Sequence, residues 1–464
     1  MPRPRLLLVN PVNQRRTGFA ASISSRFPPL NLGLLASAAT PQWDVELIDE
    51  NFETYAPREA DLAAITAFTS SVNRGYEIAG ELRSRGIPVV MGGIHVSMRP
   101  DEARQFADAV VVGEAEAVFP QVLADARAGR LQGLYQGTPI PFCDRPAARR
   151  DVYHPGYMFS SIQTSRGCPL DCDFCSVTVF NGRRYRRRPN AEVLDELETI
   201  PQELLFIVDD NIIGYGTADR EQTLALFRGM VERGMKKKWF CQASVNVADD
   251  PEVLDWAARA GCKMIFLGIE AEDPDALGAV NKRLNAKRGT DAYASIFQRI
   301  HAAGIAVLGA FIFGIDGDTP EKLLRRAEYI VHSEVDVVQM TAMTPLPGTR
   351  LFHQFEREGR LLYTDFPRDW DRYNLTEVVF HPRNMSAGEF THAMRECLDR
   401  VYDLKVLKAK AKHTLAATGQ WDAAEFAWTS NLSYREIGLS KSTFALVENG
   451  APDDVGKLTP QAAT

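Results

Sequence analysis

Two runs of alternating strand-like and helix-like segments, separated by a proline- and glycine-rich stretch, constrain the fold of this chain most strongly. Short strands that alternate with helix-length segments are typical of βαβ units, whose strands form a parallel sheet. The first run covers about residues 1–130, and the second covers about residues 161–384. A chain of 464 residues is long enough for two such α/β domains and an additional segment.

The first run predicts a doubly wound, Rossmann-like domain. Its expected strands are Arg5–Asn10, Val45–Asp49, Leu62–Phe68, Pro88–Met91 and Ala109–Val112. Sheets of this kind bind ligands beyond the carboxyl ends of their strands. Here those ends carry small and polar residues, namely Asn10, Pro11, Thr69, Ser70, Ser71, Gly92, Gly93, Gly113 and Glu114. Glycine-rich strand ends suit a ligand with a phosphate-bearing tail.

The second run predicts six further βα units. Residues 131–160 before it are rich in proline and glycine and are expected to form a linker. The expected strands are Ser161–Thr164, Leu204–Val208, Trp239–Ala243, Met264–Gly268, Ala306–Phe313 and Val337–Thr341. Six units indicate a partial (β/α)6 barrel of the TIM type, or most of a closed one, with its chemistry at the carboxyl ends of the strands.

The last part of the chain changes to a helical pattern. Ser386 and Glu389 match a capping box, and apolar residues follow at helical spacing. We expect residues 385–449 to form a helical C-terminal domain and residues 450–464 to form a flexible tail.

Three of the seven cysteines are crowded into a C-x3-C-x2-C pattern, as Cys168, Cys172 and Cys175. Such crowding indicates a metal site rather than disulfides. Thiolates are the usual ligands of iron–sulfur clusters, so three of them predict a [4Fe–4S] cluster whose fourth iron can bind a small molecule. A zinc site and a metal-free group of cysteines are the alternatives. Zinc usually takes four ligands in paired spacing, and no second pair accompanies this one.

The Arg-Gly-Cys-Pro segment that starts at Arg166, and the aromatic Phe174 before the last cysteine, resemble the radical S-adenosylmethionine (SAM) superfamily. The resemblance implies that the three cysteines hold the cluster, that the open iron binds SAM, and that an electron then cleaves SAM to methionine and a 5′-deoxyadenosyl radical. It also implies a set of SAM-binding residues: Phe174, Asp209, Asp210, Glu270, Gly309 and Gly314. As alternatives, the two aspartates are helix-capping acids and Glu270 belongs to a surface salt bridge.

The first domain resembles the cobalamin-binding domain that precedes many radical SAM domains. The similar segments are Pro28–Leu34, Gly92–His95 and Val112–Glu116. The resemblance implies cobalamin at the strand ends named above, with His95 beside them. Many cobalamin proteins ligate cobalt with the histidine of a D-x-H-x-x-G motif, which this chain lacks, so we interpret His95 as a loop residue rather than an axial ligand. Some relatives keep this domain as a scaffold without the cofactor.

The complete pattern resembles the branch of radical SAM methylases that act on hopanoids, bacteriochlorophylls and natural products. This implies methyl transfer to an unreactive carbon of a small-molecule or lipid-like substrate. The implied cofactors are a [4Fe–4S] cluster, SAM and cobalamin, with an electron donor such as flavodoxin or ferredoxin. A radical SAM cyclase, rearrangement enzyme or carbon–carbon bond-forming enzyme is the alternative. A tRNA methylthiotransferase would need three further cysteines in the first domain, and none precedes Cys143. A non-catalytic iron–sulfur or cobalamin carrier would not cleave SAM.

Charge and hydropathy restrict the environment of the chain. The net charge of −7 gives no support for a nucleic-acid partner. No apolar run reaches the ~18 residues of a membrane-spanning helix, and the first residues do not resemble a signal peptide, so we expect a cytoplasmic protein.

Two further groups of residues have alternative interpretations. Five arginines lie within Arg183–Arg188, either for an anionic ligand or, as we favour, on a solvated loop that pairs with acids such as Asp195 and Glu196. Three aromatic residues, Trp370, Tyr373 and Phe380, either line an apolar substrate pocket or, more commonly, belong to the core.

Overall fold

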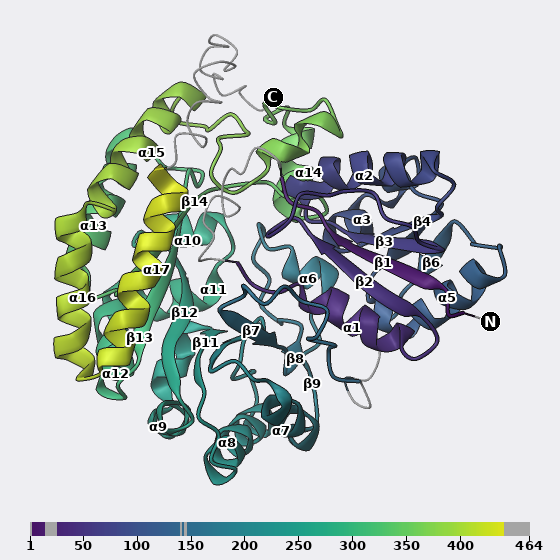
Figure 1. Ribbon diagram of the computed structural model, residues 1–464. Coiled ribbons are helices and arrows are strands. Elements are labelled where there is room, and N and C mark those ends of the chain that lie inside the picture. The colour runs from purple at the N-terminus through teal and green to yellow at the C-terminus, as the bar shows by residue number, and fades with distance from the viewer. Residues whose placement is uncertain (1, 14–25, 140–141, 143–145, 440–464) are drawn as a thin grey trace.

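The computed structural model describes residues 2–13, 26–139, 142 and 146–439. Two α/β parts lie side by side, and the C-terminal helices cover the side of the second part that faces away from the first (Figure 1). Among the helices of these residues, none is long and apolar enough to cross a membrane.

The N-terminal part contains a six-stranded sheet in which every pair of neighbours is parallel. Its strands are β1 (Arg5–Asn10), β2 (Asp44–Asp49), β3 (Leu62–Thr66), β4 (Val89–Gly92), β5 (Ala109–Val112) and β6 (Leu134–Gln136). The strand order is β2-β1-β3-β4-β5-β6, so the order reverses between β1 and β3. This is the predicted doubly wound arrangement, whose ligand crevice lies at that reversal.

Strand β6 corrects one expectation. It lies within the stretch predicted to be a linker, yet it pairs with β5 and extends the sheet by a sixth strand. The sequence signal is weak because the strand has three residues and its middle residue, Tyr135, is the buried one.

Helices cover both faces of the N-terminal sheet, which explains its nearly continuous apolar strands. One face packs against α1 (Leu30–Ala39) and α5 (Phe119–Arg127), and the other packs against α2 (Val72–Ser84). Within β1, Leu6 and Leu8 point to the first of these layers, whereas Leu7 and Val9 point to the second. The short helices α3 (Ile94–Met98) and α4 (Pro100–Ala103) follow β4.

The second part is a partial barrel. Its strands are β7 (Phe159–Ile162), β10 (Leu204–Ile207), β11 (Lys238–Ala243), β12 (Cys262–Glu270), β13 (Ala306–Phe313) and β14 (Val337–Ala342). They are parallel and lie in sequential order, with β7 and β14 as the two edges of the sheet. The helices around it are α7 (Asn190–Thr199), α8 (Thr217–Glu232), α9 (Pro251–Arg259), α10 (Pro274–Ala279), α11 (Arg283–Arg288), α12 (Tyr293–Ala302), α13 (Pro320–His332) and α14 (Arg350–Arg357).

The expected C-terminal helices are present as α15 (Ala387–Val401), α16 (Leu404–Thr418) and α17 (Trp421–Leu439). The capping box of Ser386 and Glu389 begins α15. Helix α17 packs on the sheet face opposite α12, where Ala423 and Ala427 contact the cluster that contains Met264, Leu308 and Val337. Residues 440–449 of the predicted helical domain and the predicted flexible tail, residues 450–464, lie outside the described residues.

These helices also cover the β14 edge. The Asn431 side chain accepts a hydrogen bond from the Val338 N–H and donates one to the Asp336 carbonyl. Tyr402 donates to the Val338 carbonyl at 2.8 Å. Side chains of the C-terminal helices therefore form hydrogen bonds with backbone groups at the open edge of β14, where the sheet has no further strand to pair with them.

Candidate active site

The three motif cysteines lie on a loop closed by a short antiparallel hairpin. Its strands are β8 (Ser165–Arg166) and β9 (Arg186–Arg187), and helix α6 (Val177–Phe180) follows the last cysteine. Gly167 begins the loop with φ +94°, and an added methyl group there would lie 2.3 Å from the Arg184 carbonyl oxygen. Only glycine fits this close approach, which brings the two sides of the loop together.

The three thiols are partly exposed and are close enough to interact electrostatically. Burial raises the pKa of Cys172 to about 11, and burial also raises that of Cys175, while the nearby Lys282 opposes both shifts. The Cys168 Sγ lies 3.7 Å from the Tyr215 hydroxyl. Three convergent sulfur atoms on one loop with a cation beside them suit an iron–sulfur cluster, because binding to iron keeps thiols deprotonated.

Asp209 and Asp210 both accept hydrogen bonds from the cysteine loop or the segment before it, and their predicted role in binding SAM stays a prediction. Asp209 has no exposed surface, and its carboxylate accepts hydrogen bonds from the Thr164 N–H at 2.6 Å and the Ser165 hydroxyl at 2.7 Å. Asp210 is partly exposed and accepts from the Gly167 N–H at 3.1 Å. These carboxylates hold the start of the cysteine loop.

Glu270 and Lys282 form a buried ion pair beside the cysteines. Glu270 ends β12 with φ +66°, and one of its oxygens accepts from the Lys282 Nζ at 2.5 Å. Burial alone would lower the pKa of Lys282, but Glu270 and Cys172 overcome that effect and raise it. Glu270 is therefore close to the cysteines and belongs to an internal ion pair, and its predicted contact with the SAM ribose stays a prediction.

The other predicted SAM residues occupy packed positions. Phe174 is half-buried against the barrel core. Gly309 and Gly314 are buried, and a methyl group added to them would lie 2.8 Å from Val335 and 2.4 Å from Phe390, respectively. Both glycines are thus required by packing. Whether their backbone also meets SAM stays a prediction.

The predicted cobalamin residues divide into two sets. One set is partly exposed at the carboxyl end of the sheet, namely Asn10, Ser70, Gly92, Gly93 and Gly113. The other set is buried below that surface, namely Pro11, Thr69, Ser71, His95 and Glu114. A large apolar side chain, Phe68, is 69% exposed two residues after the end of β3.

His95 is buried within a polar network that supports the strand ends. Its Nδ1 lies 3.2 Å from the Thr69 hydroxyl, and its Nε2 lies 3.2 Å from Glu102. Trp370 also donates to Glu102, and Trp370, Tyr373 and Phe380 are all buried in the core rather than lining an open pocket. His95 therefore has partners for both ring nitrogens without a cobalt ion.

Glu114, which we predicted to be a cobalamin-binding residue, pairs with two arginines of the β8–β9 hairpin. Its carboxylate pairs with Arg166 at 3.2 Å and with Arg186, and its side chain is 2% exposed. In the arginine-rich run, Arg183 and Arg184 are exposed, whereas Arg186 is partly buried and Arg188 is buried. Arg188 pairs with Glu196 at 2.7 Å, as predicted, but Asp195 pairs with Arg233.

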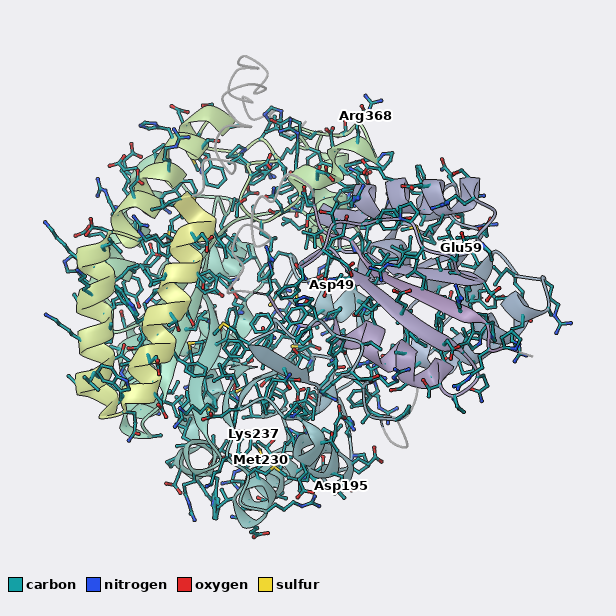
Figure 2. All side chains as sticks on the ribbon, viewed as in Figure 1. Asp49, Glu59, Asp195, Met230, Lys237 and Arg368 are labelled. Carbon is teal, nitrogen blue, oxygen red and sulfur yellow. The ribbon has the colours of Figure 1, made fainter. Side chains whose placement is uncertain are left out.

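The two strand-end regions lie against each other. Helix α3, which follows Gly92 and Gly93, contacts α6, which follows Cys175. A methyl group on Gly348 would lie 2.5 Å from the Met98 sulfur, so the Pro-Leu-Pro-Gly loop after β14 also meets α3. Asp49 accepts from the Tyr157 hydroxyl at 2.5 Å, and Figure 2 shows Asp49 between the N-terminal sheet and the barrel.

Sequence reasoning missed three residues near the cysteines. Lys282 follows α10 and is far from the motif in the chain. Tyr215 and Ser244 follow β10 and β11, and their hydroxyls lie 2.9 Å apart. Tyr215 and Ser244 could have been found from the rule that sites gather at the carboxyl ends of barrel strands, whereas no local pattern marks Lys282.

Two models of known protein families match this chain, one in each of its two α/β parts. Residues 162–330 match the family model of the radical SAM superfamily. Residues 16–123 match the model of the B12 binding domain.

The relatives belong to more than one activity class. The chain is 28% identical over 416 residues to bacteriochlorophyllide d C-12(1)-methyltransferase of Chlorobaculum tepidum, which covers 86% of this chain and 88% of that protein. It is 27% identical over 387 residues to anaerobic magnesium-protoporphyrin IX monomethyl ester cyclase of Cereibacter sphaeroides, covering 75% and 61% respectively.

A solved structure has the same fold. The radical SAM methyltransferase TsrM of Kitasatospora setae, with cobalamin and a [4Fe–4S] cluster bound, aligns with a TM-score of 0.63 at 18% identity. The alignment covers 85% of this chain and 82% of that structure. The family models therefore identify a radical SAM domain at residues 162–330, preceded by a B12-binding domain at residues 16–123, and the solved structure shows the same fold.

Proposed function

We propose that this protein is a cobalamin-dependent radical SAM enzyme that methylates an unreactive carbon of a small-molecule or lipid-like substrate. One observation carries the proposal: the carboxyl ends of the two sheets face each other. Glu114 comes directly after the Gly113 strand end, and its partner Arg166 lies two residues before Cys168. Methyl transfer needs both cofactors near one substrate. The contact between the strand ends of the two domains would bring the two cofactors close together.

Each domain has residues suited to its cofactor. Cys168, Cys172 and Cys175 would hold the cluster through sulfur, with Lys282 balancing their charge. Glu270 remains our proposed ribose-binding residue. With the cofactors bound, the cluster supplies an electron, SAM a hydrogen-abstracting radical and cobalamin a methyl group. The protein positions these groups and excludes water.

The cobalamin surface combines small and apolar residues. Gly92 and Gly93 are partly exposed where a phosphate-bearing tail would approach the backbone. Phe68 presents an exposed ring at the order reversal of the sheet, and we propose that it packs against the corrin. We place the protein in the cytoplasm, where reduced flavodoxin or ferredoxin would supply the electron.

The test uses anaerobically purified, cluster-reconstituted protein incubated with cobalamin. Iron, sulfide and cobalt are measured per chain, and SAM products are followed after addition of a reductant. We expect about four irons and one cobalt per chain, together with 5′-deoxyadenosine and S-adenosylhomocysteine. S-adenosylhomocysteine is the decisive product, because it reports methyl loading of the cobalamin.

The cyclase relative defines the main alternative outcome. Formation of 5′-deoxyadenosine without S-adenosylhomocysteine would favour a cyclisation, rearrangement or carbon–carbon coupling reaction over methyl transfer. Failure to cleave SAM with a complete cluster would overturn both activities and favour a carrier role.

A further inference from the structure

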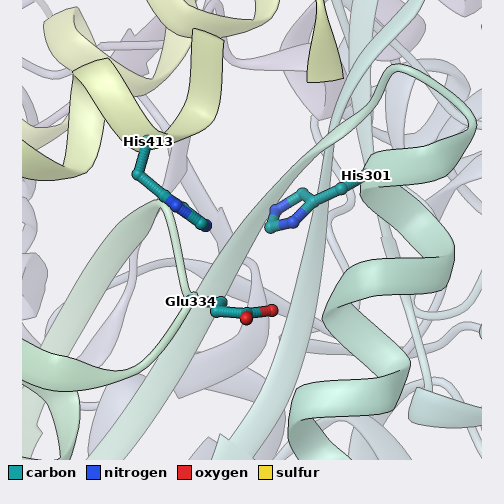
Figure 3. A group of neighbouring side chains, drawn as sticks. All are labelled: His301, Glu334 and His413. Atoms are coloured by element: carbon teal, nitrogen blue, oxygen red, sulfur yellow. The ribbon is translucent and has the colours of Figure 1, made fainter. Parts of the chain in front are cut away.

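We propose that His301, Glu334 and His413 form a second metal site, which binds one zinc ion or a similar divalent transition-metal ion. The three side chains point toward one another from separate elements (Figure 3). His301 lies on α12, Glu334 precedes β14, and His413 lies on α16. The site is at the amino ends of β13 and β14, at the opposite end of the barrel from the cysteine loop.

The distances suit one shared ion after small side-chain movements. One candidate ligand atom from each of the three residues lies within 4.8 Å of the other two. Ligand atoms at about 2.0–2.1 Å from a tetrahedral zinc ion are separated by roughly 3.4 Å. The two imidazole centroids are 5.7 Å apart, and His413 is on the exposed side of its helix, where its rotamer can change. Two imidazoles and one carboxylate form a donor set that zinc commonly takes.

His301 has the outer partner that metal-binding histidines require. Its Nε2 lies 2.7 Å from the Asp336 Oδ2, so a proton on Nε2 leaves Nδ1 with a free lone pair. Asp336 itself is fully buried and is held by the Val307 N–H and the Thr414 hydroxyl, each at 2.7 Å. This carboxylate–histidine arrangement fixes both the tautomer and the ring orientation before an ion arrives.

Glu334 supplies a carboxylate oxygen that has no hydrogen-bond partner in the part of the chain that the structure describes. Its Oε1 accepts a hydrogen bond from the Gln298 amide at 3.0 Å. Its Oε2 is buried and has no hydrogen bond from the described residues. An unpartnered buried carboxylate oxygen is costly, because it has lost water without gaining a donor. A divalent cation between Glu334 and the two histidines would remove that cost.

The position indicates a structural rather than a catalytic ion. The amino-terminal face of such barrels contributes to stability, whereas the chemistry is at the other face. Helix α16 already follows the segment before β14 closely, since Lys410 donates to the Ser333 carbonyl at 3.2 Å and the Val335 carbonyl at 2.9 Å. A metal bond from His413 to Glu334 would add a cross-link between this helix and the barrel.

The experiment uses full-length, tag-free protein with its cluster reconstituted, so that the motif cysteines are occupied and do not capture zinc. Zinc and iron per chain are measured by mass spectrometry after equilibration with Zn²⁺ and gel filtration. We expect one zinc per chain, and His413→Ala should lose it, with at least a 100-fold weaker Zn²⁺ affinity in competition with a chelating dye. Glu334→Gln should behave in the same way, and the iron content should be unchanged in both variants.

His353→Ala is the matched control, because His353 is also an exposed helical histidine near a glutamate, Glu356, at 3.7 Å. It should keep the zinc. Thermal unfolding distinguishes metal loss from misfolding. The wild type and His413→Ala should unfold at the same temperature in EDTA, and Zn²⁺ should raise the unfolding temperature of the wild type only. Absence of bound zinc in the wild type, or equal zinc in His413→Ala, would overturn the proposal.

Discussion

Removal of the Glu114 charge should loosen the junction between the two domains. The Glu114→Gln change keeps the side-chain shape but leaves Arg166 and Arg186 without their shared carboxylate. These guanidiniums are only 10% and 12% exposed, and Glu114 is 2% exposed. A guanidinium in a protein carries its positive charge, so the variant leaves both buried charges without this partner.

The magnitude follows from burial and distance. Unit charges 3.2 Å apart attract by about 5 kcal/mol at an effective dielectric constant of ~20. Desolvation offsets part of this attraction, but removal of one partner from a buried pair typically costs about 3–5 kcal/mol. Glu116 still neutralises Arg166 in the variant, so we expect the lower end, about 3 kcal/mol. This corresponds to local opening that is about 100-fold more frequent.

Hydrogen exchange with mass spectrometry measures this opening directly. Peptides that cover β5 and the β8–β9 hairpin should exchange about 100-fold faster in Glu114→Gln, whereas peptides from α12 should not change. The control is Glu77→Gln, which removes an exposed partner of Arg74 and should change exchange by less than a factor of about 3. If Glu114→Gln exchanges like the control variant, the ion pair does not hold the domains together.

Three further predictions concern the cluster, the cobalamin surface and the C-terminal helices. Cys168→Ala should abolish cluster absorption and SAM cleavage, whereas Cys397→Ala, in the buried core, should keep both; retained cleavage in the first variant would reject the cluster assignment. Gly93→Val should release cobalamin but keep the iron, because Gly93 has φ +99° and an added methyl group would lie 2.8 Å from a threonine hydroxyl. Gly80→Ala has open space and should bind cobalamin normally, and equal cobalt in both glycine variants would contradict the proposed site. Burial lowers the pKa of Lys410 from 10.5 to about 8, so the unfolded chain binds more protons between these values and stability should rise with pH there. The free energy of unfolding, measured with a chemical denaturant, should rise by up to about 3 kcal/mol in the wild type and should not rise in Lys410→Met. Identical pH profiles for the two proteins would refute this prediction.

Local patterns predicted the architecture because strand and helix periodicity depends on near neighbours in the chain. The doubly wound sheet, the partial barrel and the C-terminal helices all follow from such patterns. Strand β6 was missed because three residues carry too little periodicity to be recognised. It becomes a strand only because β5 offers it a free edge.

The cysteine loop was also predictable, since its three thiols lie within one short segment. Its surroundings were not. The burial of Asp209 beneath the loop depends on contacts with Thr164 and Ser165, more than forty residues away in the chain. Sequence shows an acid at a strand end, but only packing decides whether that acid faces a ligand or supports a neighbour.

The sequence alone therefore determined the order of the two domains, the strand ends at which we place the ligands and the thiols that suit a cluster. Tertiary structure decided which charged residues reach those positions. Glu114 pairs with arginines that lie over fifty residues away, Lys282 approaches the cysteines from beyond β12, and His301, Glu334 and His413 meet across three elements. Electrostatic and metal-binding contacts depend on distance in space, and no local pattern encodes that distance for residues far apart in the chain.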